Sequence, residues 1–197
     1  KMIAGVYPHG SDHSLAFEGV VIPTFPAPFA VCYAFLHAVH HLLSSGIGLR
    51  HVCDYAILLH THHSASDRAW LTRAFGSLGM QRMAAAFEQV IRFLLKMDPG
   101  EFPAFPRLHL SHAQQTADEE LLLSDILESG NFGKYDERIT PRPRGYWAGK
   151  WHTFRRATTR ARRFHRLLPS QTRWYALQLV KGTLTIQWNK LRRRLHG

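Results

Sequence analysis

Two glycines between two apolar, helix-length segments constrain the fold of this chain more than any other feature. The first segment runs from about Phe29 to Ser44 and the second from about Leu49 to His62. Gly46 and Gly48 lie between them and permit a tight turn with positive φ. Because so short a link leaves the two helices side by side, the pattern predicts an antiparallel helix hairpin.

Further helix-length segments follow, so the predicted fold class is mainly α. We expect a helical bundle-like domain with a basic two-helix C-terminal appendage and little or no sheet. The additional helices are expected at about 66–77, 80–97, 116–129, 150–168 and 171–195. Short strands are expected at most around 3–7 and 17–22, in a stretch with many prolines and glycines.

Caps and an apolar stripe define three of these helices. Ser66 or Asp67 is expected to cap the third, and Thr116 with Glu119 fits a capping box for the fifth. The fourth has apolar residues at three- and four-residue steps, which predicts a face buried in the core. The residues of this stripe are Met80, Met83, Ala84, Phe87, Val90, Ile91 and Leu94.

Composition and charge divide the chain unevenly. Residues 1–28 are expected to be a loop-rich segment, 29–136 a helical domain, 137–149 a linker and 150–197 a basic helical tail. Residues 1–137 contain nine Lys or Arg and fourteen Asp or Glu, whereas residues 138–197 contain sixteen Lys or Arg and no acid. Such a segment is expected to meet a polyanion or an acidic protein face.

The tail leaves three partners open: a docking face on the helical domain, an anionic membrane surface and, least favoured, nucleic acid. The last helix has an apolar stripe suited to docking or to a membrane interface. Trp147, Trp151 and Phe154 have rings that can stack on bases. The residues expected to bind an anionic surface are Arg155, Arg156, Arg160, Arg162, Arg163, Arg166, Arg173, Lys181, Lys190, Arg192, Arg193 and Arg194.

Other sequence features limit the expected location of the protein and the chemistry that it can perform. Cys32 and Cys53 lie on apolar helical segments and are expected to be free thiols, as in a reducing compartment. No run of eighteen apolar residues is present, so no membrane-spanning helix is predicted. The expected location is the cytoplasm, with peripheral attachment at the inner face of the membrane as an option. No serine or cysteine stands in a recognisable nucleophile motif.

His37 and His41 are four residues apart, so their rings share one face of the first helix. Zinc uses such pairs, but it needs a third and usually a fourth ligand. Neither His-Glu-x-x-His nor a paired cysteine spacing is present, and we therefore predict no metal site. The two rings are expected to pack between helices or to contact another domain. Other histidines that could contribute ligands are His40, His51, His60, His62 and His63.

Arg50 and Asp54 are four residues apart on the second helix, and two interpretations remain open. In the first, Arg50 locks the helix corner by binding carbonyls and Asp54, so Arg50→Ala costs about 1–3 kcal/mol. In the second, its guanidinium binds a substrate phosphate. We also expect Gly48→Val to destabilise the fold, because a β-branched residue does not easily adopt positive φ.

The chain resembles a family of uncharacterised nucleotidyltransferase-like proteins of bacteria. In that family an apolar helix with His-x-x-x-His runs into Gly-Ile-Gly-Leu-Arg and an Asp-aromatic pair, as in residues 35–56 here. The sequence Gly-Asn-Phe-Gly-Lys-Tyr-Asp at residues 130–136 is similar to a second family motif, and order and spacing agree over 21–136. The residues singled out are His37, His41, Gly46, Gly48, Arg50, Asp54, Asn131, Gly133, Tyr135 and Asp136.

The resemblance implies nucleotidyl transfer from a nucleoside triphosphate to an unknown acceptor, with Mg²⁺. Enzymes of this superfamily hold divalent metal with an Asp-x-Asp and a third carboxylate after a Gly-Ser turn. Gly10 and Ser11 are present, but the chain has no Asp-x-Asp, and it begins at Lys1. We therefore expect the C-terminal part of a longer protein, inactive alone, whose N-terminal catalytic domain is its partner. The alternative is a non-catalytic basic helical adaptor for a membrane or nucleic acid.

Overall fold

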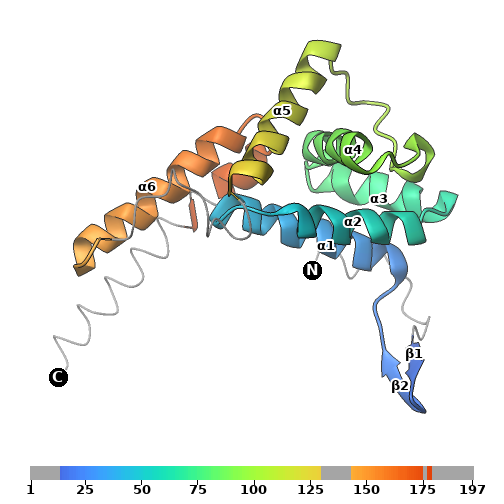
Figure 1. The fold of residues 1–197 in the computed structure, drawn as a ribbon. Helices are drawn as coiled ribbons and strands as arrows, with labels where there is room; N and C mark the ends of the chain where they lie inside the picture. Colours follow the sequence, from blue (N-terminus) through green and yellow to red (C-terminus); the bar gives the residue numbers. More distant parts are fainter. Residues whose placement is uncertain (1–13, 130–142, 175–176, 179–197) are drawn as a thin grey trace.

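The computed structural model describes residues 14–129, 143–174 and 177–178. In these residues the fold is mainly α, which confirms the predicted class, and one two-stranded hairpin projects from the helices (Figure 1). The strand expected around 3–7, the motif at 130–136 and most of the last basic helix lie outside the described residues.

The hairpin pairs β1 (Ser14–Phe17) with β2 (Val20–Pro23) in antiparallel register, with Phe17 opposite Val20. Glu18 and Gly19 form the two-residue turn with φ of 47° and 81°, the positive values that a tight hairpin turn requires. The apolar side chains of Phe17, Val20 and Val21 are each at least 60% exposed, so the hairpin buries little against the helices.

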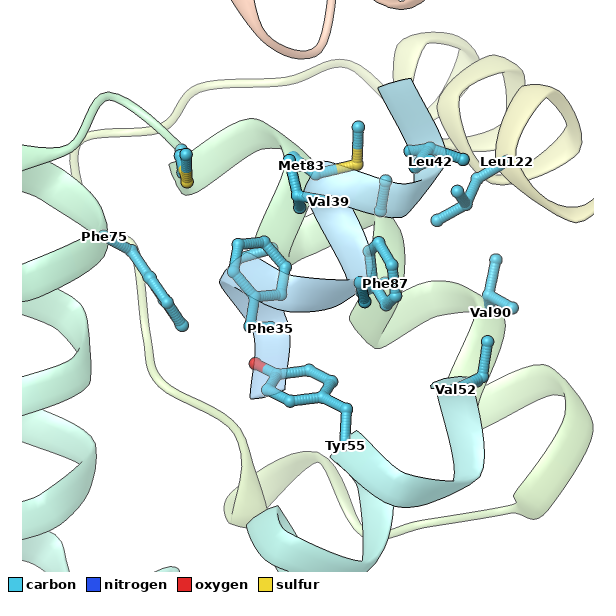
Figure 2. Close-up of a cluster of buried hydrophobic side chains, with 14 of the residues drawn as sticks. Phe35, Val39, Leu42, Val52, Tyr55, Phe75, Met83, Phe87, Val90 and Leu122 are labelled. Atoms are coloured by element: carbon cyan, nitrogen blue, oxygen red, sulfur yellow. The ribbon is translucent and has the colours of Figure 1, made fainter. Parts of the chain in front are cut away.

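Helices α1 (Ala27–Ser44) and α2 (Leu49–Thr61) lie side by side at the centre of the fold and confirm the predicted helix hairpin (Figure 1). Phe35 of α1 meets Tyr55 of α2 and Phe87 across the core, with ring centroids 5.3 Å away in both pairs (Figure 2). By length and composition α1 could cross a membrane. However, Val31, Phe35 and Leu42 are fully buried, as in a core helix.

Helices α3 (Ala65–Ser77) and α4 (Gln81–Leu95) complete the packing around α1. Ser64 caps α3 by accepting a hydrogen bond from the Asp67 amide, so the cap expected at Ser66 or Asp67 was wrong by two or three residues. The predicted stripe of α4 is confirmed, because every member except the half-buried Leu94 is buried in the core.

A one-turn 3-10 helix, η1 (Pro99–Glu101), leads to α5 (His112–Ser129). The capping box of α5 is Ser111 with Gln114, whose side chains each accept from the other residue's amide. The box expected at Thr116 and Glu119 was therefore wrong. Thr116 lies inside the first turns, and its hydroxyl donates to the His112 carbonyl instead.

Helix α6 (Tyr146–Phe164) begins four residues earlier than expected and packs against α1. Phe164, Leu167 and Leu168 are fully buried in the same core cluster as the earlier helices. The second half of α6 and the turn after it are thus integrated into the helical domain, whereas most residues from Tyr146 to Arg155 are exposed.

Candidate functional site

The corner between α1 and α2 is closed by backbone hydrogen bonds. The amides of Ser45 and Gly46 both donate to the His41 carbonyl at 2.8 Å, and Gly46 has φ of +98°. Gly48 has φ of −105° and ψ of 176°, which any residue can adopt. The expectation that Gly48 needs positive φ was wrong, because Gly46 alone makes the left-handed turn at this corner.

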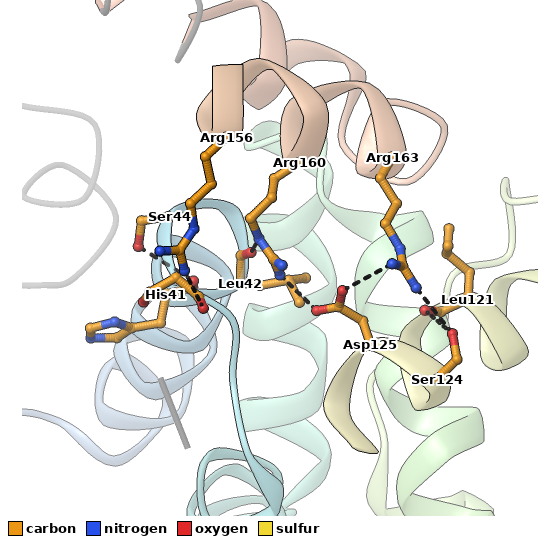
Figure 3. Close-up of polar contacts among 10 residues, drawn as sticks. His41, Leu42, Ser44, Leu121, Ser124, Asp125, Arg156, Arg160 and Arg163 are labelled. Atoms are coloured by element: carbon orange, nitrogen blue, oxygen red, sulfur yellow. Dashed lines mark hydrogen bonds and ion pairs between the residues drawn. The ribbon is translucent and has the colours of Figure 1, made fainter. Parts of the chain in front are cut away.

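Arginines of α6 hold this corner from outside the α1–α2 hairpin (Figure 3). Arg160 donates from Nε to the Leu42 carbonyl at 2.6 Å, and Arg156 donates to the Ser45 carbonyl at 3.1 Å. These carbonyls belong to the end of α1, where the last turn leaves acceptors without helical partners and the helix dipole is negative. The two guanidinium groups therefore cap α1 and fix the chain reversal.

Two buried carboxylates of α5 pair with arginines, and one of them anchors Arg160 (Figure 3). Asp125 is fully buried and accepts from Arg160 at 2.6 Å, while Arg163 lies 3.5 Å from its other oxygen. Two turns earlier on the same face, Asp118 accepts a bidentate pair from Arg82 and is paired with Arg166 at 2.7 Å. Each buried acid thus faces two arginines, and α5 is bound to both of its neighbours.

Three histidines gather on the outer side of the corner. The ring centroids of His37 and His41 on α1 are 4.5 Å apart, and His51 in the first turn of α2 lies 5.5 Å from His41 and 6.3 Å from His37. One ring nitrogen from each lies within 4.8 Å of the others. His37 is exposed, while His41 and His51 are partly buried, so the group opens toward solvent.

Burial and repulsion from neighbouring histidines favour neutral imidazoles at His41 and His51. Burial lowers the pKa of His41, and the neighbouring His37, His51 and His40 lower it further. Burial also lowers the pKa of His51, as does His37, against smaller opposing effects of Asp54 and the Gly48 backbone. An unprotonated imidazole has a nitrogen lone pair, which ligation of a metal requires.

Arg50 does not lock the corner. Its side chain is 85% exposed, and its ion pair with Asp54 spans 3.8 Å between groups that both meet water. The structural interpretation of Arg50 was therefore wrong: Arg156 and Arg160 bind the carbonyls instead. Arg50 lies beside His51 at the start of α2, with its guanidinium directed to solvent.

Replacing Arg50 by alanine is consequently expected to leave the fold almost unchanged. An exposed i,i+4 ion pair contributes about 0.3–0.5 kcal/mol, so the free energy of unfolding should fall by no more than that. Urea denaturation at low and high salt measures the effect. A loss of more than about 1.5 kcal/mol would show that Arg50 has buried partners after all.

The predicted anion-binding residues divide by helix face. Arg160 is buried and bonded internally, and Arg156, Arg163 and Arg166 have partners within the domain. Arg155, Arg162 and Arg173 are exposed. Lys181, Lys190 and Arg192–Arg194 lie outside the described residues, as do the motif residues Asn131, Gly133, Tyr135 and Asp136. Of the predicted anion-binding residues that the structure describes, Arg155, Arg162 and Arg173 are exposed and have no ion pair within the domain among the described residues.

Sequence inspection missed how the corner is built. Nothing in the spacing assigned Asp125 to Arg160, because the two are 35 residues apart and join different helices. His51 was one of five further histidines without a distinguishing pattern. Its place in the first turn of α2, three residues after Gly48, is the signal that could have selected it.

Comparison with known proteins supports one resemblance. Residues 9–95, a little under half of the chain, match the sequence profile of a family described as uncharacterised nucleotidyltransferase. The matched span contains the hairpin, α1–α4 and all three corner histidines, and it ends before the motif at 130–136. No curated protein and no solved structure gives a significant match.

Proposed function

We propose that this chain is the helical, non-catalytic part of a nucleotidyltransferase that moves a nucleotidyl group from a nucleoside triphosphate to an acceptor. The observation that carries the proposal is the family match over residues 9–95. The matched helices would pack against a catalytic domain of the same protein and help to bind the acceptor. The catalytic carboxylates would lie in that domain, because this chain has no Asp-x-Asp.

Arg50 is the residue of this chain that we assign to the substrate. A guanidinium suits bidentate contact with phosphate oxygens, and Arg50 presents one to solvent, with a 3.8 Å ion pair to the exposed Asp54. It stands at the N-terminal end of α2, where the positive end of the helix dipole also favours an anion. Arg50 would therefore orient the triphosphate and balance its charge while other residues perform the transfer.

The described residues do not fit the Mg²⁺ that such a reaction uses. Mg²⁺ prefers carboxylate and water oxygens. The two buried carboxylates, Asp118 and Asp125, already face arginines at 2.6–3.5 Å. Among the described residues, the group with ligand geometry consists of imidazoles, which suit other metals. No catalytic step is therefore assigned to a metal ion held by the described residues.

The hairpin supports a packing role. An isolated two-stranded hairpin is marginally stable, and apolar side chains on both faces usually mark a contact surface. Here Phe17, Val20 and Val21 are 60–69% exposed, and Phe25 after the second strand is 66% exposed. We assign this surface to the proposed catalytic domain of the same protein, because the hairpin lies in the first part of the matched span.

Two measurements test the proposal together. The coding sequence in frame upstream of Lys1 should contain an Asp-x-Asp on a strand-like segment. The isolated chain, incubated with α-labelled nucleotides, Mg²⁺ and candidate acceptors, should release no pyrophosphate. Metal-dependent release by the isolated chain would contradict the assignment of catalysis to another domain. An upstream sequence without the paired carboxylates would contradict the proposal that the protein is a nucleotidyltransferase. The alternative, a non-catalytic basic helical adaptor, would then remain.

The outer face of α6 favours a second function, attachment to an anionic membrane surface. Trp147 and Trp151 are 69% and 67% exposed, and Trp151 stacks on Phe154 at 5.8 Å. Arg155 and Arg162 are exposed on the same helix, while Arg156 and Arg160 point to the domain. Exposed aromatic rings with cations form the pattern that binds lipid headgroups and the acyl boundary.

Vesicle binding is expected to be salt-dependent and to shift Trp fluorescence to the blue. Replacing Trp147 and Trp151 by serine should weaken binding to vesicles with acidic lipids, since burial of both rings is lost. Trp70, which is buried in the core, is left in place. Tight binding of RNA without binding of vesicles would favour nucleic acid, and binding of neither would contradict attachment.

A further inference from the structure

The histidine group at the corner has the arrangement of a metal site. His37 and His41 project one turn apart from the same face of α1, and His51 reaches the pair from the first turn of α2. One ring nitrogen from each lies within 4.8 Å of the other two. A short link closed by hydrogen bonds to His41 joins the two helices, so their relative position is fixed before any ion binds.

We propose that His37, His41 and His51 bind a divalent transition-metal ion, with Zn²⁺ as the best match. Three imidazoles are a common protein ligand set for Zn²⁺, whereas Mg²⁺ and Ca²⁺ select oxygen ligands. The site leaves a fourth position for water or an anionic group. This inference is independent of the proposed transfer reaction and of any Mg²⁺ held elsewhere.

The three ring nitrogens are close enough to reach one metal ion by side-chain movement. Zn–N bonds of about 2.0–2.1 Å place tetrahedral ligand nitrogens about 3.3 Å apart. The present separations of at most 4.8 Å therefore need a contraction of up to about 1.5 Å. Rotation of the exposed His37 ring supplies part of this movement without disturbing the core.

A neighbouring aromatic ring supports His37. Tyr33, one turn earlier on α1, stacks on the His37 ring with centroids 6.0 Å apart. The exposed His37 leaves the group open to solvent, and the Arg50 side chain, one residue before His51, is 85% exposed.

Zinc binding by the whole chain tests the site. Competition with a chromophoric chelator should show one high-affinity equivalent, and X-ray absorption of the zinc-loaded protein should show about three imidazole ligands with one further light atom. His37→Ala should weaken this binding at least about tenfold, and His41→Ala and His51→Ala should do the same. His37 is exposed, so its variant keeps the fold even if the other two do not.

Matched controls separate the site from the other histidines. His40→Ala removes an exposed ring beside His41 on the same helix, and His63→Ala removes one beyond the far end of α2. Both variants should keep wild-type zinc affinity. The proposal is overturned if wild-type protein binds no zinc at micromolar concentration, or if His37→Ala binds as tightly as wild type. Equal weakening by His40→Ala and His37→Ala would also overturn it.

Discussion

Replacing Asp125 by alanine should destabilise the protein by about 3–5 kcal/mol, the largest effect that we expect from one substitution. The change removes the carboxylate that faces Arg160 at 2.6 Å and Arg163 at 3.5 Å. Arg160 is 7% exposed and would keep a buried charge bonded only to the Leu42 carbonyl. Chemical denaturation with circular dichroism measures the loss.

Glu120→Ala is the matched control, because it removes the same charge from an exposed position of α5. It should change the free energy of unfolding by less than about 1 kcal/mol. The variant Asp125→Ala should also loosen the corner, since Arg160 joins Asp125 to the end of α1. If Asp125→Ala and Glu120→Ala unfold at the same denaturant concentration, the buried ion pairs of Asp125 do not hold the helices together.

Replacing Gly46 by valine should cost about 1–3 kcal/mol. Its φ of +98° lies outside the range that a β-branched residue adopts, and the residue is buried in the turn that joins α1 to α2. Thermal denaturation and urea titration give the cost. The rearranged turn would also move α2 relative to α1, so zinc affinity should fall if the three corner histidines bind the ion.

Gly48→Ala is the control for this prediction. Gly48 is also buried in the link, but its φ of −105° suits an L-residue. The cost of Gly46→Val should therefore exceed that of Gly48→Ala by more than 1 kcal/mol, as positive φ requires. Equal stability of the two variants would show that conformation at residue 46 does not determine the corner.

Local pattern was enough to predict the helices and one face of the core. The α4 stripe from Met80 to Ile91 is buried because apolar residues at three- and four-residue steps share one side of a helix. Helix starts were less predictable, because Ser64 and Ser111 compete as caps with Ser66 and Thr116 a few residues away. Any of these hydroxyl groups can cap a helix, and tertiary position decides which one does.

The site was less predictable, because it depends on contacts between distant segments. Arg50 attracted attention through its motif, yet the carbonyls at the corner are bound by Arg156 and Arg160, more than 100 residues away. These arginines look like any others in a segment without acids. Only the packing of α6 on α1 distinguishes them from Arg155 and Arg162, which face solvent.

The central claim is that arginines of α6 hold the α1–α2 corner, so that the Arg50 side chain remains available to bind substrate. The most direct test measures nucleotidyl transfer by this chain together with the proposed catalytic domain, with and without Arg50→Ala, and compares the melting curves of both proteins. Loss of charge-assisted hydrogen bonds to phosphate should lower kcat/KM about 10–100-fold, with an unchanged Tm. Undiminished transfer by Arg50→Ala, or a loss that follows a lower Tm, would contradict the claim.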